Sequence, residues 1–195
     1  MRAGPWRFLM YLLLPQPAKM AFLPAELDGQ LDRINLAANV AMYSGSKARG
    51  YDAAHRYNAA EHHEYPAQQL VQGPWRGAGY GRALEVGAGS GYFTRLVAGA
   101  AEVVFAVEPV PDMQRVLREG CDAHGIRNVE ILALSAIDCA DRLLPGSVDS
   151  ALVIQSLHHM HQRAEVFQAL GRVVRPGGRP LMVEPHHNLR RVARL

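Results

Sequence analysis

One short stretch, residues 82–94, constrains the fold of this chain more than any other. Its sequence, RALEVGAGSGYFT, is typical of a short apolar strand, a turn with glycine at alternate positions, and the start of a helix. Glycine allows the backbone to turn sharply and allows a bulky ligand to lie against the main chain. The stretch therefore predicts a strand–turn–helix unit whose turn, at Gly87, Gly89 and Gly91, faces a ligand.

The same stretch argues against two kinds of phosphate site. No Gly-Lys-Ser/Thr follows the glycines, so a phosphate-binding P-loop is excluded. The last glycine of the dinucleotide fingerprint G-x-G-x-x-G would fall on Tyr92, which disfavours a nicotinamide cofactor. Glu85 lies just before the first glycine, where a carboxylate repels a pyrophosphate and suits a ligand that carries positive charge.

From Arg82 onward, predicted strands alternate with predicted helices. The strands are expected at 82–86, 102–107, 129–134, 148–155 and 179–184. Helices are expected at 91–98, 111–124 and 161–174, with a loop or short helix at 136–144 and a tight turn at 175–178. This alternation is typical of a mostly parallel α/β sheet with helices on both faces.

The region before the sheet, residues 20–78, is predicted to be a helical cap. Apolar residues recur at helical spacing over 25–43, namely Leu27, Leu31, Ile34, Ala38 and Met42, and Gly45 is the expected stop. A segment that contains tyrosines, 47–58, and a second helix, 60–72, follow. The cap either packs on the sheet as a plain cover, the interpretation favoured here, or forms a lid whose tyrosines reach a ligand.

Composition sets wider limits on the class of protein. The chain has 195 residues, of which 49% are hydrophobic and 20% charged, as expected for one globular domain. The net charge is only +3 and no dense basic run occurs, so no nucleic-acid or membrane partner is indicated. Cys121 and Cys139 form no paired motif, which favours a reducing compartment and a cytoplasmic location.

Residues 1–19 are kept outside the fold prediction. The apolar run 8–14 is too short to span a bilayer, which takes about 20 residues. It is interpreted either as a mis-assigned or unstructured leader or as a targeting segment.

Four blocks of the sequence together resemble a known family. Glu85 and the three glycines resemble the first motif of class I S-adenosylmethionine (SAM)-dependent methyltransferases, of the methyltransferase type 11 kind. Glu108 after the second strand, the segment 148–160, and the turn 170–178 with its Pro-Gly-Gly follow in the family's order. The resemblance covers 83–185 and implies a three-layer Rossmann-like sheet of order 3-2-1-4-5, over 79–195. The family usually adds two more strands, so the domain is expected to be C-terminally incomplete.

The resemblance and the spacing together predict a SAM site. Glu108 lies about 20 residues after the glycine turn, where an acidic side chain accepts hydrogen bonds from ribose hydroxyls. By resemblance, Gly87, Gly89 and Gly91 make room for the amino-acid moiety and Glu85 faces the cationic end of the ligand. Met113, Ala136, Ile137 and Gln155 complete the predicted cofactor-binding residues, although core packing is an equal interpretation for the apolar ones.

The loop after the third predicted strand departs from the family's pattern. In the family this loop often carries an aspartate that contacts the adenine amino group. Ser135 occupies that position here, and Asp138 follows three residues later as a substitute. Adenine recognition is therefore the least supported part of the predicted site.

His158 is the candidate catalytic residue. It lies in the loop after the fourth strand, at the ligand-binding edge of such a sheet, where an imidazole is able to take a proton from an attacking atom. The alternative is a hydrogen-bonded loop histidine without a catalytic role. The pairs at 62–63, 158–159 and 186–187, with His161, have no cysteine or carboxylate at zinc-site spacing, and no metal is predicted.

The predicted function is SAM-dependent methyl transfer to an unidentified acceptor, most simply a small molecule. Two alternatives from other classes stay open. One is a non-catalytic SAM-fold binding protein or truncated pseudoenzyme, and the other is a nicotinamide-dependent oxidoreductase, which shares the sheet and Glu108.

Overall fold

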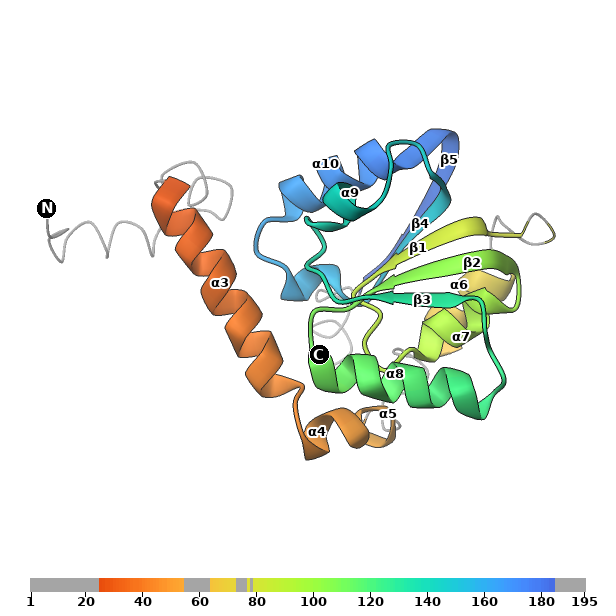
Figure 1. Cartoon of the computed structure of the whole chain (residues 1–195), viewed down its shortest axis with the longest axis horizontal. Coiled ribbons are helices and arrows are strands. Elements are labelled where there is room, and N and C mark those ends of the chain that lie inside the picture. The colour runs from red at the N-terminus through yellow and green to blue at the C-terminus, as the bar shows by residue number, and fades with distance from the viewer. Residues whose placement is uncertain (1–24, 55–63, 73–76, 78, 185–195) are drawn as a thin grey trace, which may run out of the picture.

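The computed structural model describes residues 25–54, 64–72, 77 and 79–184. Five parallel strands form one sheet in the order β3-β2-β1-β4-β5 (Figure 1). Their bounds are β1 Gly81–Val86, β2 Ala101–Val107, β3 Val129–Leu132, β4 Val148–Ile154 and β5 Val174–Val183. The predicted parallel sheet and its strand order are confirmed. The predictions for residues 1–19, 62–63 and 186–187 lie outside the described residues.

Helices cover both faces of the sheet, which gives three layers. On one face lie α7 Tyr92–Ala98 and α8 Pro111–Ala123, with α6 Tyr65–Gln72 beside α7 (Figure 1). On the other face lie α9 Cys139–Arg142 and α10 Arg163–Val173. The local sequence explains α8 well, because Pro111 suits its first turn and its buried side chains recur every fourth position, at Met113, Leu117 and Cys121.

The core consists of two layers that share the strands. Side chains alternate along a strand, so Leu84 and Val86 of β1 pack toward α9 and α10, whereas Ala83 packs toward α7. β2 and β4 are buried over most of their length, as expected for strands covered on both faces. The two cysteines are buried in different layers, Cys121 on the inner side of α8 and Cys139 in α9.

Besides α6, the described residues before the sheet form one long helix, α3 Ala25–Met42, and two short ones, α4 Ser46–Arg49 and α5 Tyr51–Ala54. The predicted first helix is thereby confirmed, and α3 runs beside the edge of the sheet at which the strands end (Figure 1). Its predicted apolar face is not the face that packs, because Ile34 is 63% exposed and Met42 is 52% exposed. The side of α3 that faces the sheet carries Asn35, Leu36 and Asn39 instead.

The fifth strand differs from the prediction. It starts at Val174 rather than at Arg179, and the Pro-Gly-Gly segment lies inside it. The pairing with β4 moves from Val148↔Val174 to Ser150↔Arg179, so the extra residues of β5 bulge out of the ladder. Arg175 anchors this bulge through a 2.6 Å hydrogen bond from its Nε to Asp149 Oδ1.

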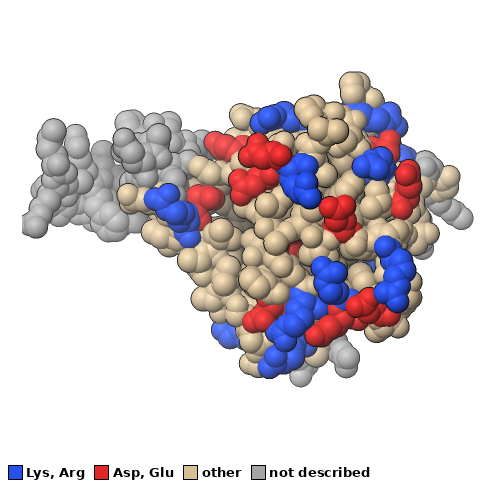
Figure 2. Space-filling view, viewed as in Figure 1, with Lys and Arg blue, Asp and Glu red and all other residues tan. Residues whose placement is uncertain are grey.

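The charged side chains of the surface show no large patch of one sign on the visible face. Figure 2 shows Lys and Arg interspersed with Asp and Glu over this side of the molecule. Among the helices of the described segments, none combines the length and the apolarity that crossing a bilayer requires.

Candidate functional site

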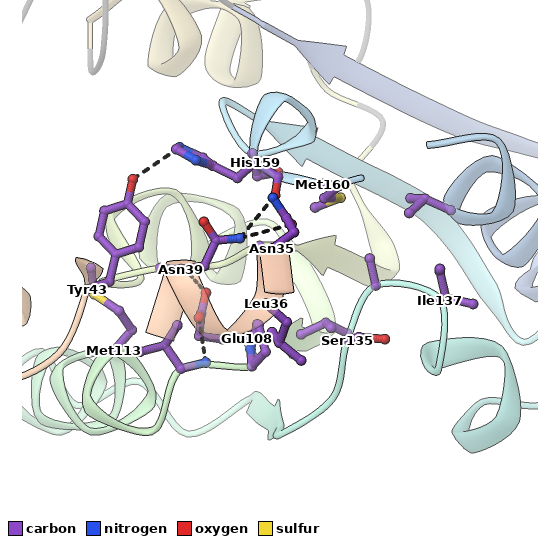
Figure 3. A pocket seen from close by; sticks show the side chains of 18 of the residues that line it. Asn35, Leu36, Asn39, Tyr43, Glu108, Met113, Ser135, Ile137, His159 and Met160 are labelled. Carbon is purple, nitrogen blue, oxygen red and sulfur yellow. Dashed lines mark hydrogen bonds between the residues drawn. The ribbon is translucent and has the colours of Figure 1, made fainter. Parts of the chain in front are cut away.

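A cavity opens at the carboxyl ends of the strands, with about 900 Å³ of empty space. This edge is where open parallel sheets bind ligands, at the point where the strand order reverses, here between β1 and its neighbour β4. The loops after β1, β2, β3 and β4 form its floor, and α3 and α5 form its outer wall (Figure 3). Helices before the sheet therefore contribute to the site, as the lid interpretation requires.

The three glycines of the turn have different surroundings. All have a left-handed backbone, with φ of 74° at Gly87, 57° at Gly89 and 79° at Gly91. A Cβ added at Gly87 would lie 2.5 Å from Cβ of Ser156, and one at Gly91 would lie 2.6 Å from Cγ of Leu117. A Cβ at Gly89 would meet nothing within 4 Å. Gly87 and Gly91 thus permit close packing of the protein. Gly87 and Gly89 both line the cavity, and Gly89 is the one with open space for a ligand, whereas Gly91 lies outside the lining.

Glu108 lines the cavity and is held by backbone amides on both oxygens. Its Oε2 accepts a 2.8 Å hydrogen bond from the N–H of Gly89, and its Oε1 accepts a 2.9 Å bond from the N–H of Val110. Burial raises the pKa of this carboxyl, and the two amides act in the opposite direction. Each oxygen of a carboxylate accepts more than one hydrogen bond, so Glu108 is able to bind ligand hydroxyls while it keeps the turn in place.

Glu85 lies beneath the turn rather than on the cavity wall. It is 2% exposed, and its Oε2 accepts a 2.6 Å hydrogen bond from Oγ1 of Thr94 in α7. Burial raises its pKa to about 7, and the nearby Glu108 adds to this rise. A direct contact between Glu85 and a ligand is therefore not part of this geometry, and the remaining route is an electrostatic one through the turn.

Predicted apolar and strand-end residues come together in the cavity. Met113 of α8 and Ala136 and Ile137 of the loop after β3 line it, with Met113 and Ile137 at opposite sides of the view in Figure 3. Gln155 lines it from the end of β4, with a φ of 50° that is uncommon for a residue other than glycine. Backbone strain of this kind is common at ligand sites. The same backbone conformation at Gln155 ends β4 at Ile154, one residue earlier than predicted.

The substitute predicted for the missing adenine contact lies away from the cavity wall. Ser135 lines the cavity, and its Oγ donates a 2.7 Å hydrogen bond to Oδ2 of Asp138. Asp138 itself is exposed and does not line the cavity. Of these two residues, only Ser135 is placed where it could meet an adenine in the cavity.

The two histidines after β4 have different partners. His158 is exposed, lies outside the cavity lining, and its Nδ1 is 2.7 Å from Oε2 of Glu184. His159 is half-buried and lines the cavity, with its Nε2 3.2 Å from the hydroxyl of Tyr43 (Figure 3). The catalytic role of His158 stays a prediction, but the histidine that meets the cavity is its neighbour, and sequence spacing carries no signal that separates the two.

The lid interpretation included the tyrosines of the wall formed by α3 and α5, but not its asparagines. Asn35, Asn39 and Tyr43 lie at helical spacing on one side of α3 and the turn after it, and Tyr51 follows on α5. Asn39 Nδ2 donates a 3.0 Å hydrogen bond to the carbonyl oxygen of His159 and a 3.4 Å bond to Oδ1 of Asn35 (Figure 3). The spacing of Asn35 and Asn39, four residues apart, could have indicated a polar side of α3 that faces the site. The apolar pattern of the same helix pointed to a different side.

The charged residues on the cavity wall are acidic. Asp32 and Glu108 line it, and no Lys or Arg of the described segments does. Within those segments no group of three or more His, Cys, Asp or Glu side chains is arranged to hold a metal ion. The remaining lining residues are Leu36, Gly87, Val107, Pro109, Val110, Ser156, Met160, Gln162 and Val166. The cavity thus combines an apolar floor with a polar, weakly acidic outer wall.

Comparisons with known proteins agree on one family. A family model described as a methyltransferase domain matches residues 84–182. "Uncharacterized methyltransferase Rv3342" of Mycobacterium tuberculosis (strain ATCC 25618 / H37Rv) is 38% identical over 99 residues, which are 50% of this chain and 37% of the relative. The chain therefore matches little more than a third of that relative's length.

Solved structures show the same fold. A structure titled "DhpI-SAM-HEP complex" has a TM-score of 0.59 and 24% identity, and the match covers 82% of this chain and 71% of that one. A putative S-adenosyl-L-methionine-dependent methyltransferase from Methanococcus maripaludis has a TM-score of 0.60 and 14% identity, over 70% of this chain and 62% of that one. Since the family model covers half of the chain, the chain belongs to the methyltransferase domain family.

Proposed function

We propose that this domain binds SAM in the cavity and transfers its methyl group to a small-molecule acceptor. One observation carries the proposal: the open space at Gly89 lies beside the amide-held carboxylate of Glu108, at the edge of the sheet where the family match falls. A dinucleotide would instead bring a pyrophosphate close to acidic groups. SAM supplies an activated methyl group, and the chain's residues bind and orient the reactants.

The proposed roles follow from the contacts. Glu108 accepts hydrogen bonds from the ribose hydroxyls, and Gly89 leaves room for the amino-acid moiety. Met113, Ala136 and Ile137 form the apolar surface for the adenine ring. Glu85 acts through the turn, where its charge favours a cationic ligand, because burial keeps it from touching one. Gln155 is proposed to contact the ligand because its strained backbone aims it at the cavity.

The acceptor is proposed to bind between the floor of the cavity and α3. The polar side chains on that wall, Asn35, Asn39 and Tyr43, supply hydrogen bonds rather than a large apolar surface. A small, polar acceptor therefore fits better than a macromolecule.

Isothermal titration tests the cofactor. SAM is expected to bind, NADH in a parallel titration is expected not to bind, and Glu108→Ala is expected to weaken SAM binding by about 10- to 100-fold, the range for hydrogen bonds to a charged group. Glu119→Ala, on the exposed side of α8, is the matched control and should bind as the parent does. Tight NADH binding, or unchanged SAM binding in Glu108→Ala, would contradict the proposal. SAM binding without transfer to any acceptor would favour the non-catalytic alternative.

A further inference from the structure

His159 is held at the cavity by two residues that are far from it in the sequence. The hydroxyl of Tyr43 is 3.2 Å from its Nε2, and the two rings meet edge to face with centroids 5.5 Å apart. Asn39 fixes the backbone of the same histidine by a 3.0 Å bond to its carbonyl oxygen. Ring and backbone are thus both fixed from α3 and the turn after it, which places an imidazole–phenol pair on the acceptor side of the cavity (Figure 3).

A second histidine and a carboxylate extend this pair away from the cavity. The rings of His158 and His159 have centroids 4.0 Å apart, and His158 Nδ1 is 2.7 Å from Oε2 of Glu184. The other oxygen of Glu184 accepts hydrogen bonds from the N–H groups of Ser156 and Leu157, so the carboxylate is fixed in place. A positive charge on His159 is therefore destabilised by the neighbouring His158 and stabilised by the carboxylate of Glu184.

We propose, on the basis of the proposed function, that Tyr43 and His159 act as a proton relay for the acceptor, and that the acceptor is a hydroxyl compound. A carboxylate acceptor is already ionised near neutral pH and needs no such relay. A hydroxyl has to lose its proton as it attacks, and a positioned base contributes to this step. The absence of Lys and Arg from the described cavity wall agrees, because an anionic acceptor would have no cation there.

The step balances as follows. The hydroxyl of Tyr43 donates its proton to Nε2 of His159, and its oxygen takes the proton of the acceptor's hydroxyl. The acceptor oxygen uses the electron pair of its broken O–H bond to form the bond to the methyl carbon. The carbon–sulfur bond breaks with its electron pair left on sulfur, which becomes neutral. The products are a methyl ether, an intact Tyr43 phenol and a positively charged His159.

The resting protonation states of the pair are the ones that the relay needs at its start. Burial first, and His158 second, lower the pKa of His159, so its imidazole is neutral near pH 7 and able to accept a proton. Burial, with a smaller effect of Glu108, raises the pKa of Tyr43, so its phenol keeps a proton to donate. The other groups that face the pair are the ring of Tyr51 against Tyr43, His158 and Glu184.

The first test needs neither cofactor nor acceptor. In long-range ¹H–¹⁵N spectra of the free protein, the signals of His159 are assigned by their loss in His159→Gln. The relay requires the tautomer with the proton on Nδ1, because Nε2 accepts from Tyr43. Tyr43→Phe should abolish this preference, whereas Tyr65→Phe, an exposed tyrosine of α6, should leave it unchanged. A proton fixed on Nε2 in the parent would overturn the proposal.

The second test measures transfer with phenol, 2-phenylethanol and benzoate as probes, by formation of the demethylated cofactor. The parent is expected to methylate a hydroxyl probe. His159→Gln and Tyr43→Phe are expected to lose about 10²–10⁴-fold in rate at pH 7, the usual contribution of a positioned base. His124→Gln, at the far end of α8, should retain full activity. With phenol, the rate of His159→Gln should recover toward pH 10, where the probe ionises by itself.

These results separate the relay from a purely structural contact and from failure of the proposed function. SAM affinity and the urea midpoint are measured for every variant, so a change in rate at constant affinity and stability identifies the relay. Transfer to benzoate alone, an unchanged rate in both variants, or SAM binding with no transfer to either hydroxyl probe would each overturn the proposal. Loss of SAM binding in the parent would instead contradict the proposed function.

Discussion

Gly89 and Gly91 have the same left-handed backbone but meet different neighbours. We predict that Gly91→Ala destabilises the fold by about 2–4 kcal/mol, since it adds backbone strain and overpacks against Leu117. Gly89→Ala should destabilise it by only about 1–2 kcal/mol, because the new methyl group meets no protein atom.

Ligand binding should rank the two variants in the opposite order. Gly89→Ala places its methyl group where the cofactor is proposed to lie, so it should weaken SAM binding more than Gly91→Ala does. Urea unfolding and titration calorimetry on both variants provide the comparison. If Gly91→Ala were the weaker binder of the two while it stayed as stable as the parent, the assignment of open space at Gly89 would be wrong.

A second residue-scale prediction concerns the pH dependence of stability at Glu85. Its folded pKa of about 7 is higher than the value of about 4.5 in the unfolded chain, so the folded state binds more protons between these values. Stability should therefore fall as pH rises from about 4.5 to 7, by about 3 kcal/mol for this group. Glu85→Gln keeps an acceptor for Thr94 and should remove this part of the decline.

The test of Glu85 is a difference between two curves. Urea midpoints of the parent and of Glu85→Gln are measured from pH 4.5 to 8, so that contributions of other groups cancel. Parallel curves would show that Glu85 has the same pKa in the folded and unfolded states. Thr94→Val, which removes the hydrogen bond to Glu85, should steepen the parent's decline.

At this scale the sequence indicated much of the site. The alternation of glycines and the distance to Glu108 can be read directly from the sequence, and Gly87, Gly89 and Glu108 line the cavity, whereas Gly91 does not. The choice between His158 and His159 was different, because it depends on the direction in which the chain turns after β4. The positive φ of Gln155 sets that direction, and no pattern of residue types encodes it.

At the scale of elements, α3 is the part whose placement decides the shape of the cavity. Asn39 joins it to the loop after β4, and we predict that Asn39→Ala destabilises the protein by about 1 kcal/mol, the net value of one such hydrogen bond. In hydrogen exchange, the segment around Asn39 and Tyr43 should lose more protection than α10. Asn35→Ala is the matched control, since the hydrogen bond of its side chain is with Asn39 inside α3 and not with the loop.

Exchange that stays the same in Asn39→Ala would show that other contacts hold α3. The sequence predicted this helix but not its orientation. Hydrophobic periodicity identifies the buried side only when the buried side is apolar. Here the side that meets the cavity is polar, and Ile34 and Met42 lie on the exposed side, so the rule selected the wrong face.

At the scale of the whole molecule, one end of the sheet forms the cavity and the opposite end holds strands together. The cavity lies at the carboxyl ends of the strands, and at the opposite end Asp149 joins three strands. Its Oδ2 accepts a 2.7 Å bond from the N–H of Arg82 in β1, and its Oδ1 accepts a 2.6 Å bond from Nε of Arg175 in β5. These bonds lower the pKa of Asp149, so their stabilisation is present above the unfolded pKa and is lost as the pH falls through the folded value.

We predict that Asp149→Asn lowers stability by about 1 kcal/mol and leaves SAM affinity unchanged. The side-chain amide oxygen of the variant still accepts from the backbone N–H of Arg82, whereas the charge opposite Arg175 is lost. Urea midpoints and calorimetry at pH 7 test this separation. A change in SAM affinity would show that the two ends of the sheet are coupled.

The sheet as a whole was the best-predicted feature. Strands that are buried on both faces have short, continuous apolar sequences, and these are easy to recognise. The bulge in β5 was not predicted. Its extra residues are accommodated by the pairing with Asp149 and Ser150, which is a contact between distant parts of the chain.

Because one cysteine is buried in each layer, the rate at which each thiol is labelled should report how often its layer opens. Burial raises the pKa of Cys121, and raises that of Cys139 to about 11, so neither thiol should react with a disulfide reagent until its layer opens. If labelling requires global unfolding, a ligand at 100 times its Kd should slow both thiols by about 100-fold. If the labelling rate of one thiol stays the same when the ligand is added, its layer opens without global unfolding. The two single variants, Cys121→Ser and Cys139→Ser, would show which layer that is.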